Sequence, residues 1–374
     1  MAAPTPSEVL DVEEVSHSTL AVYAQQLQIC LQWDPLEGVV GESKQLFVEA
    51  LTEIAAMSLD SISMEIRRLL VVSRNGYEAR DALAVDATPQ QLQAEQQLHL
   101  RNLIAALSAR DVQLKCKAAN AVGSLCISRV AGQQLLDLYG EQILRSVAKM
   151  ATCKNQWAQG DAFFVLGWMV VIADEDTLQG IAKLLPTVVK CLHRNVNLPS
   201  RGRNGNNGEE GESGAAARRS REALASSEQA SNFRVYALVL LLNFSQRHVD
   251  EFEELLEKLL PLLRDLVTKL LEPAPLPIAA NSDESTITEA LSTTVFDASE
   301  YAEILRLTIT LLSVLVGQLE SSSAQLLELK MLPSLLKLKR VLETPQVVEL
   351  VSEDGIQDIT ERLEAVIKTL VNCR

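Results

Sequence analysis

The stretch KLLPTVVKCLHR, residues 183–194, has a proline in the middle of an apolar run with helical spacing. A proline inside a helix leaves one backbone hydrogen bond unmade and clashes with the preceding turn, which costs about 3 kcal/mol or more. At the first position of a helix proline is well tolerated, because the N–H group that it lacks would have no partner there. Pro186 therefore predicts the start of a helix.

The same arrangement recurs twice further along the chain. Pro261 in LLPLLRDLVTKLL and Pro333 in MLPSLLKLKRVL each follow an apolar pair and precede apolar residues at helical spacing. Two earlier segments, around Arg101 and Leu144, fit this frame without a proline. We therefore expect each of the three prolines to open a helix.

A second pattern accompanies the first. Four segments of small and apolar residues each precede one of these frames: AANAVGSL (118–125), AFFVLGWM (162–169), ALVLLLNF (237–244) and ITLLSVL (309–315). The offset is nearly constant, at 18 positions from Trp168 to Pro186 and 20 from Ser313 to Pro333. Two patterns that move together along the chain indicate a repeated helical unit.

The length of the repeat follows from these alignments. Ser124 and Trp168 occupy equivalent positions 44 residues apart. Later gaps are longer because of two insertions, at about residues 198–229 and 273–297, whose Gly, Ser, Asn and Pro content is typical of flexible loops. Without the insertions the repeat is about 40–47 residues long.

These segments resemble armadillo and HEAT repeats, in which a second helix started by proline is followed by a long third helix reading A-x-x-A-[VL]-x-x-L. The resemblance implies an all-α fold, a right-handed α-solenoid of about five to six armadillo/HEAT-like repeats with two flexible loop insertions. We expect these repeats over residues 95–371. Residues 17–94 are expected to form an N-terminal helical cap or degenerate repeat, and residues 1–16 a disordered N-terminus.

The composition agrees with a helical protein, and the net charge limits the classes of partner that it could bind. Aromatic residues make up 4% of the chain, and Asn-Gly or Asp-Gly turns between alternating runs are nearly absent. The net charge of −15 argues against nucleic acid or an anionic membrane as the main partner and favours a basic one. The longest apolar run is too short for a membrane span, which needs about 20 residues.

Cysteine usage and the N-terminus indicate the compartment. None of the six cysteines forms a C-x-x-C motif, which favours buried thiols in a reducing environment. The acidic N-terminus lacks the apolar core of a signal peptide. We expect a cytoplasmic and/or nuclear location.

No catalytic or cofactor motif is present in the sequence. The four histidines show no metal-binding spacing, and H-E-x-x-H, G-x-S-x-G and phosphate-binding glycine motifs are absent. Carboxylate runs such as residues 250–258 fit a solvated helix face. We therefore expect a non-catalytic protein without a cofactor or metal.

The armadillo resemblance implies that third helices line a concave binding surface. Similar proteins such as importin-alpha use a Trp and an Asn four residues apart on successive third helices to hold an extended basic peptide. In this sequence the Trp positions hold Asn120, Phe164 and Val239, and the Asn positions hold Ser124, Trp168 and Asn243. Asn243 alone matches, so the ladder that holds an extended peptide backbone is absent.

The same six residues predict a different partner-binding face. Phe164 and Trp168 would form a central aromatic patch, which suits an amphipathic helix or a peptide with an apolar anchor. The alternative is that Phe163, Trp168 and Met169 belong to the core between repeats, because FFVLGWMVV is apolar on all sides. Gly167, in the middle of this helix, predicts a close approach by a neighbouring helix.

The predicted function is protein binding as a scaffold, adaptor or assembly chaperone that takes a peptide or helix of a partner along the concave face. One alternative is a nuclear transport adaptor or receptor, and another is a helical enzyme or cofactor-binding protein. Ser220 in ARRSRE is a possible phosphorylation site for a basophilic kinase, and a plain solvated linker is the alternative there.

Overall fold

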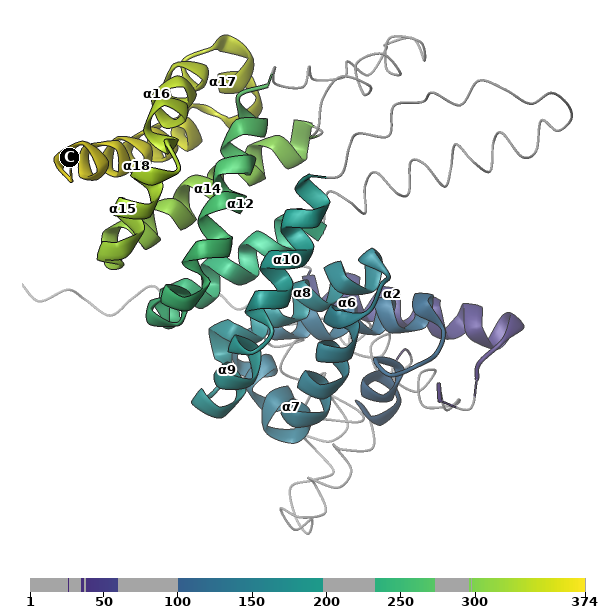
Figure 1. The fold of residues 1–374 in the computed structure, drawn as a ribbon. Coiled ribbons are helices and arrows are strands. Elements are labelled where there is room, and N and C mark those ends of the chain that lie inside the picture. Colours follow the sequence, from purple (N-terminus) through teal and green to yellow (C-terminus); the bar gives the residue numbers. More distant parts are fainter. Residues whose placement is uncertain are drawn as a thin grey trace, which may run out of the picture. The chain divides into compact units, whose positions relative to one another are not determined.

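The computed structural model describes residues 26, 35–36, 38–59, 100–197, 233–272, 296 and 298–373 (Figure 1). Within this part of the chain all regular secondary structure is helical. The chain divides into two compact units, one made of residues 1–149 with 172–177 and the other of residues 150–171 with 178–374.

The first unit contains α2 (Gly41–Leu59), a helical segment at residues 100–106, α6 (Val112–Ile127) and most of α7 (Arg129–Thr152). Helix α2 packs against α6. Asp111 caps α6 by accepting a hydrogen bond from the backbone N–H of Leu114 at 3.1 Å, and Lys44 Nζ of α2 lies 2.7 Å from Asp111 Oδ2.

From α8 onward the chain repeats one order of helices: a helix of 15 or more residues, a short helix of 7–9 residues and a helix of 12–15 residues. The first round is α8 (Gln156–Ile172), α9 (Glu175–Ala182) and α10 (Leu185–Val196). The second is the helix of residues 233–247, the 3₁₀ helix η1 (Val249–Leu255) and α12 (Leu256–Leu270). The third is α14 (Ala298–Gln318), α15 (Glu320–Glu328) and α16 (Met331–Leu342), followed by α17 (Pro345–Val351) and α18 (Glu353–Asn372).

Helices α10, α12 and α16 each contain one of the recurring prolines. Pro186 is in the first turn of α10 and Pro333 is the third residue of α16, which confirms that these two open helices. Pro261 lies inside α12, so the prediction that it opens a helix is wrong. The reason is that η1 runs directly into α12, and the α-helix therefore begins at Leu256, upstream of the proline.

The segment with Leu144 in place of a proline forms an uninterrupted helix. Leu144 lies within the continuous helix α7, whereas the round that contains Pro186 is divided into α9 and α10. A leucine keeps its backbone N–H and is a good helix former, so nothing in this frame interrupts α7.

Helix α8 and the helix of residues 233–247 pack closely, and two glycines on one face of α8 permit this. A Cβ atom at Gly160 would lie 3.4 Å from Phe233 Cα, and one at Gly167 would lie 3.6 Å from Leu240 Cα. The expected close approach at Gly167 is thereby confirmed. The buried rings of Phe163 and Phe233 add to this contact, with centroids 5.3 Å apart.

A buried ion pair joins helices that flank the two sequence insertions. Arg234, 8% exposed, donates from Nε and Nη2 to both carboxylate oxygens of Glu300 in α14, which is 2% exposed. Arg234 Nη1 also donates to Asn195 Oδ1 of α10 at 3.0 Å. The guanidinium carbon lies 5.3 Å from the centre of the Phe296 ring.

Several predicted segments lie outside the described residues. They include residues 1–16, most of 17–94, Ser220 and almost all of both insertions. Near the predicted end of the second insertion, at about residue 297, Phe296 is buried against Arg234. Among the described helices no single one is long and apolar enough to cross a membrane, and α14 with α15 meets that test only as a pair bent by 120°.

Candidate partner-binding face

Four of the six predicted contact residues lie on two neighbouring helices. Phe164 and Trp168 are on α8, Val239 and Asn243 are on the helix of residues 233–247, and all four are partly exposed. We call these four residues, together with Trp157, Asp161 and Tyr236, the third-helix face.

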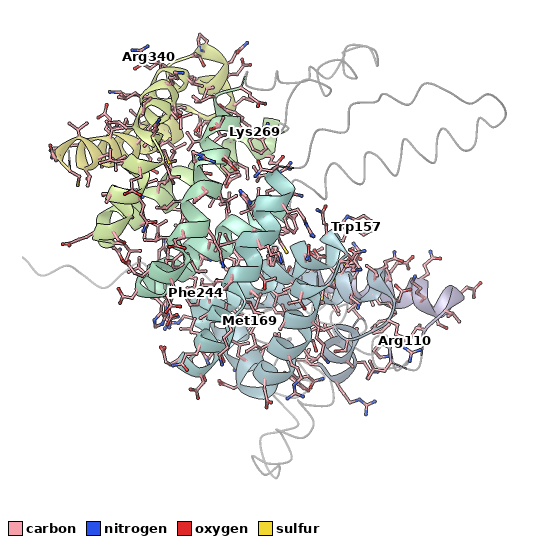
Figure 2. All side chains as sticks on the ribbon, in the orientation of Figure 1. Arg110, Trp157, Met169, Phe244, Lys269 and Arg340 are labelled. Atoms are coloured by element: carbon pink, nitrogen blue, oxygen red, sulfur yellow. The ribbon has the colours of Figure 1, made fainter. Side chains whose placement is uncertain are left out.

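Along α8 the residues of this face are spaced three or four apart. Trp157, Asp161, Phe164 and Trp168 therefore lie on one side of the helix. Trp157, labelled in Figure 2, is 41% exposed. The opposite side of α8 is apolar and buried, and includes Phe163 and Met169.

Tyr236 connects the two helices across this face. Its ring centre lies 4.9 Å from that of Phe164, with the planes tilted by 39°. Burial, and next the charge of Asp161, raise the pKa of the Tyr236 hydroxyl above its ordinary value. Tyr236 therefore keeps its proton at neutral pH and offers a hydrogen-bond donor beside the aromatic rings.

Polar side chains fix the helix of residues 233–247 to α8. Asn243 Nδ2 donates to the carbonyl oxygen of Gly167 at 2.9 Å. Arg247 Nη1 donates to the carbonyl oxygens of Val170 at 2.9 Å and Val171 at 3.2 Å, in the last turn of α8. A cation is favourable at that end because the helix dipole is negative there.

Some residues of the FFVLGWMVV segment belong to the core and others lie on the predicted binding face. Phe163 and Met169 are fully buried, which confirms that they belong to the core. Phe164 and Trp168 are partly exposed on the other side of the same helix.

The other two predicted contact residues lie on α6, in the first unit. Asn120 is partly exposed, and its Nδ2 donates to the carbonyl oxygen of Cys116 at 3.1 Å. Ser124 is 1% exposed, so its side chain is not available to a partner and its prediction as a contact residue is wrong. The sequence gives its place on a helix face, but a small side chain there is easily covered by a neighbouring helix.

A polar cluster between α10 and α12 was not predicted. His193 Nε2 lies 3.2 Å from Asp265 Oδ2, to which Asn197 Nδ2 donates at 3.0 Å, and Arg264 Nη2 donates to Asp265 Oδ1 at 2.9 Å. Burial would raise the pKa of Asp265, but these hydrogen bonds, led by that from Asn197, outweigh it and lower the pKa below its ordinary value. In the part of the chain that the structure describes, no group of three or more His, Cys, Asp or Glu residues is placed to hold a metal ion.

Comparison with known proteins identifies the fold. No protein-family model and no curated protein sequence matches this chain. A designed armadillo repeat protein, YIII(Dq)4CqI, aligns over 93% of this chain and 99% of its own length, with 12% identity and a TM-score of 0.50. A structure described as computationally designed armadillo repeat proteins for modular peptide recognition aligns over the same shares, with 13% identity and a TM-score of 0.50.

The fold is armadillo-like. The all-α, armadillo-like repeat predicted from the recurring prolines is thereby confirmed. In armadillo terms α8, the helix of residues 233–247 and α14 are third helices, and α10, α12 and α16 are second helices.

Proposed function

We propose that this chain is a non-catalytic binding protein that holds a peptide or a helix of a partner protein on the third-helix face. The observation that carries the proposal is the partial exposure of Phe164 and Trp168 beside fully buried neighbours on the same helix. Large aromatic side chains of this kind supply much of the affinity at protein interfaces.

The rigidity of the face supports this function. Gly160 and Gly167 bring α8 and its neighbouring helix into backbone contact, and Asn243 and Arg247 tie the two helices by hydrogen bonds. Side chains that are already fixed before binding lose less conformational entropy when a ligand arrives.

The chemistry of the face favours a partner segment with one apolar side. Phe164, Trp168 and Val239 would contact the apolar anchors, while Asp161 and Asn243 lie where polar groups of the segment could bond. The modular peptide recognition stated for one matching structure supports a peptide ligand here. Scaffold, adaptor and assembly chaperone roles would all use such a site.

The test starts with peptides selected for binding from a display library. We expect the Phe164→Ala/Trp168→Ala variant to bind them more weakly by about tenfold or more, since truncation of a hot spot costs above about 1.4 kcal/mol. Its melting temperature should stay near that of the wild type. Leu46→Ala/Val371→Ala, which truncates exposed apolar side chains on α2 and α18, is the control and should bind as the wild type does.

Two results would contradict the proposal. One is equal binding of the selected peptides by wild type and the aromatic double variant. The other is a loss of several kcal/mol of stability in that variant, which would assign both rings to the core.

A further inference from the structure

Charge is distributed unevenly among the helices of the repeats. Helices α10 and α16 contain basic residues and no acidic one. The short helices α9, η1 and α15, which precede the second helices, contain acidic residues and no basic one. In a chain with a net charge of −15, the second helices thus carry a local excess of positive charge.

On α16 two of the three basic side chains share one exposed face. Leu336, Lys337 and Arg340 are exposed and follow Pro333 at positions three, four and seven, so they lie on the same side of the helix. Arg340, labelled in Figure 2, extends from α16 away from the packed helices. Leu336 is 46% exposed, which places a large apolar side chain among the cations.

Helix α10 also carries an exposed cation four positions after its proline, and α12 packs against both α10 and α16. Lys190 and Arg194 follow Pro186 at positions four and eight, and both are exposed. We call the exposed side chains of α10 and α16, namely Lys190, Arg194, Leu336, Lys337 and Arg340, the second-helix row.

The cations of the row are not neutralised by neighbouring acids. Lys190, Arg194, Lys337 and Arg340 form no ion pair or hydrogen bond within the described residues. Nearby carboxylates already have other partners, because Asp265 of α12 accepts from Arg264 and Asn197, and Glu364 of α18 pairs with Lys339 at 2.6 Å. Glu328 is the last residue of α15, and Glu343, which follows the last residue of α16, is exposed three positions after Arg340 on the same side and marks the end of the row.

We propose that the second-helix row binds an acidic segment of a partner protein, with an apolar side chain of that segment placed on Leu336. Unpaired cations on the two helices α10 and α16 complement carboxylates spaced along a peptide. The row is on helices other than those of the third-helix face, so the two sites are independent.

Charge and composition favour a peptide over a nucleic acid. Nucleic acids carry one charge per ~1.7 Å of duplex and bind extended basic surfaces. Here the basic row is confined to α10 and α16, and the acidic helices α9, η1 and α15 that precede the second helices would repel a polyanion that extends beyond the row. Helices α10, α12 and α16 contain no Phe, Tyr or Trp on which bases could stack.

The experiment measures binding of labelled synthetic probes to the full chain by fluorescence anisotropy at low and physiological salt. The probe is a glutamate-rich peptide with one central leucine, and its counterpart replaces each glutamate by lysine. We expect the acidic peptide alone to bind, and more weakly as salt rises. Lys337→Glu/Arg340→Glu should weaken binding at least about tenfold, and Leu336→Ser by about threefold to tenfold.

A matched control separates this site from the net charge of the protein. Arg110→Glu/Lys154→Glu changes the charge by the same amount at exposed residues on neither α10 nor α16, and should bind within about twofold of the wild type. Phe164→Ala/Trp168→Ala should also bind the acidic peptide normally, because it alters the third-helix face.

Three results would overturn the proposal. The acidic peptide could fail to bind better than its lysine counterpart. The two charge-reversal variants could lose binding equally, which would mean that the overall charge of the protein, and not the row itself, determines binding. A DNA duplex or a phosphatidylserine vesicle, used as further probes, could bind more tightly than the peptide, which would assign the row to a different kind of partner.

Discussion

Single residues decide how the helices around the insertions are joined. Arg234 lies between Phe233 and Val235 in the sequence, and this pattern gives no sign that its charge is buried. The structure places it against Glu300 and Asn195, so one guanidinium bonds to two other helices. A bidentate pair of this kind has well-defined geometry, which makes the partners of Arg234 specific.

Arg234→Met should destabilise the protein by about 3–5 kcal/mol, because it leaves the Glu300 carboxylate buried without its cation. Arg234→Met/Glu300→Leu should recover much of that loss, since neither charge then remains. Urea unfolding followed by circular dichroism measures both. A change below about 1 kcal/mol in the single variant would show that Glu300 reaches water or another donor.

Asp265 predicts a dependence of stability on pH. Its pKa is lowered in the folded protein, so its hydrogen bonds stabilise the fold above the unfolded-state pKa of about 3.9 and cease to do so as pH falls through the folded-state value. The stability difference between wild type and Asp265→Asn should therefore be present at about pH 5 and shrink below about pH 4. Urea unfolding over this range checks it. A difference that stays the same in acid would be inconsistent with this assignment.

At the scale of elements, the position of a proline within its helix decides its energetic effect. Pro186 occupies the first turn of α10, where no intrahelical donor is needed, whereas Pro261 is interior to α12. The sequence spacing correctly places Pro186 at the start of a helix and wrongly places Pro261 there. It does not reveal Leu256 as the beginning of α12, because 3₁₀ and α turns have similar apolar spacing over a few residues.

Pro261→Ala should therefore stabilise the protein by about 1 kcal/mol or more, because it restores a donor in the helix interior. Pro186→Ala, the matched control, should be neutral or lose up to about 1 kcal/mol, since proline at that site restricts the unfolded chain. Thermal unfolding of both variants measures the difference. Destabilisation by Pro261→Ala would mean that the ring itself is needed for packing against a neighbour.

At the scale of the whole molecule, the armadillo-like fold was predictable because its helices recur at regular spacings in the sequence. These spacings can be recognised without knowing which distant residues are in contact. The partners of individual residues were not predictable in this way. Asn243 matched a known peptide-binding position, yet its amide bonds to the backbone of Gly167. Ser124 and Phe296 are buried, Phe296 against Arg234 of another segment, and sequence periodicity carries no information about such neighbours.

The division into two compact units predicts that a substitution that destabilises one unit leaves the stability of the other unchanged. A Cβ atom at Gly132 of α7 would lie 3.0 Å from Cys126 Cα and would overlap the Ile172 side chain, so Gly132→Ala should loosen the first unit. Hydrogen exchange should then rise in α2 and α6 and stay unchanged in α14, α16 and α18. Gly140→Ala, where the nearest atom is 3.7 Å away, is the control and should leave exchange unchanged. Equal acceleration throughout the chain would show that both units unfold as one.

The placement of Trp157 and Trp168 gives the protein a built-in optical reporter. The chain has three tryptophans, and these two belong to the third-helix face. Indole emission moves to shorter wavelength when water around the ring is displaced. A ligand that binds over α8 should therefore shift the tryptophan emission to shorter wavelength, with no added dye. A ligand that binds the lysines and arginines of α16 should leave the emission spectrum unchanged.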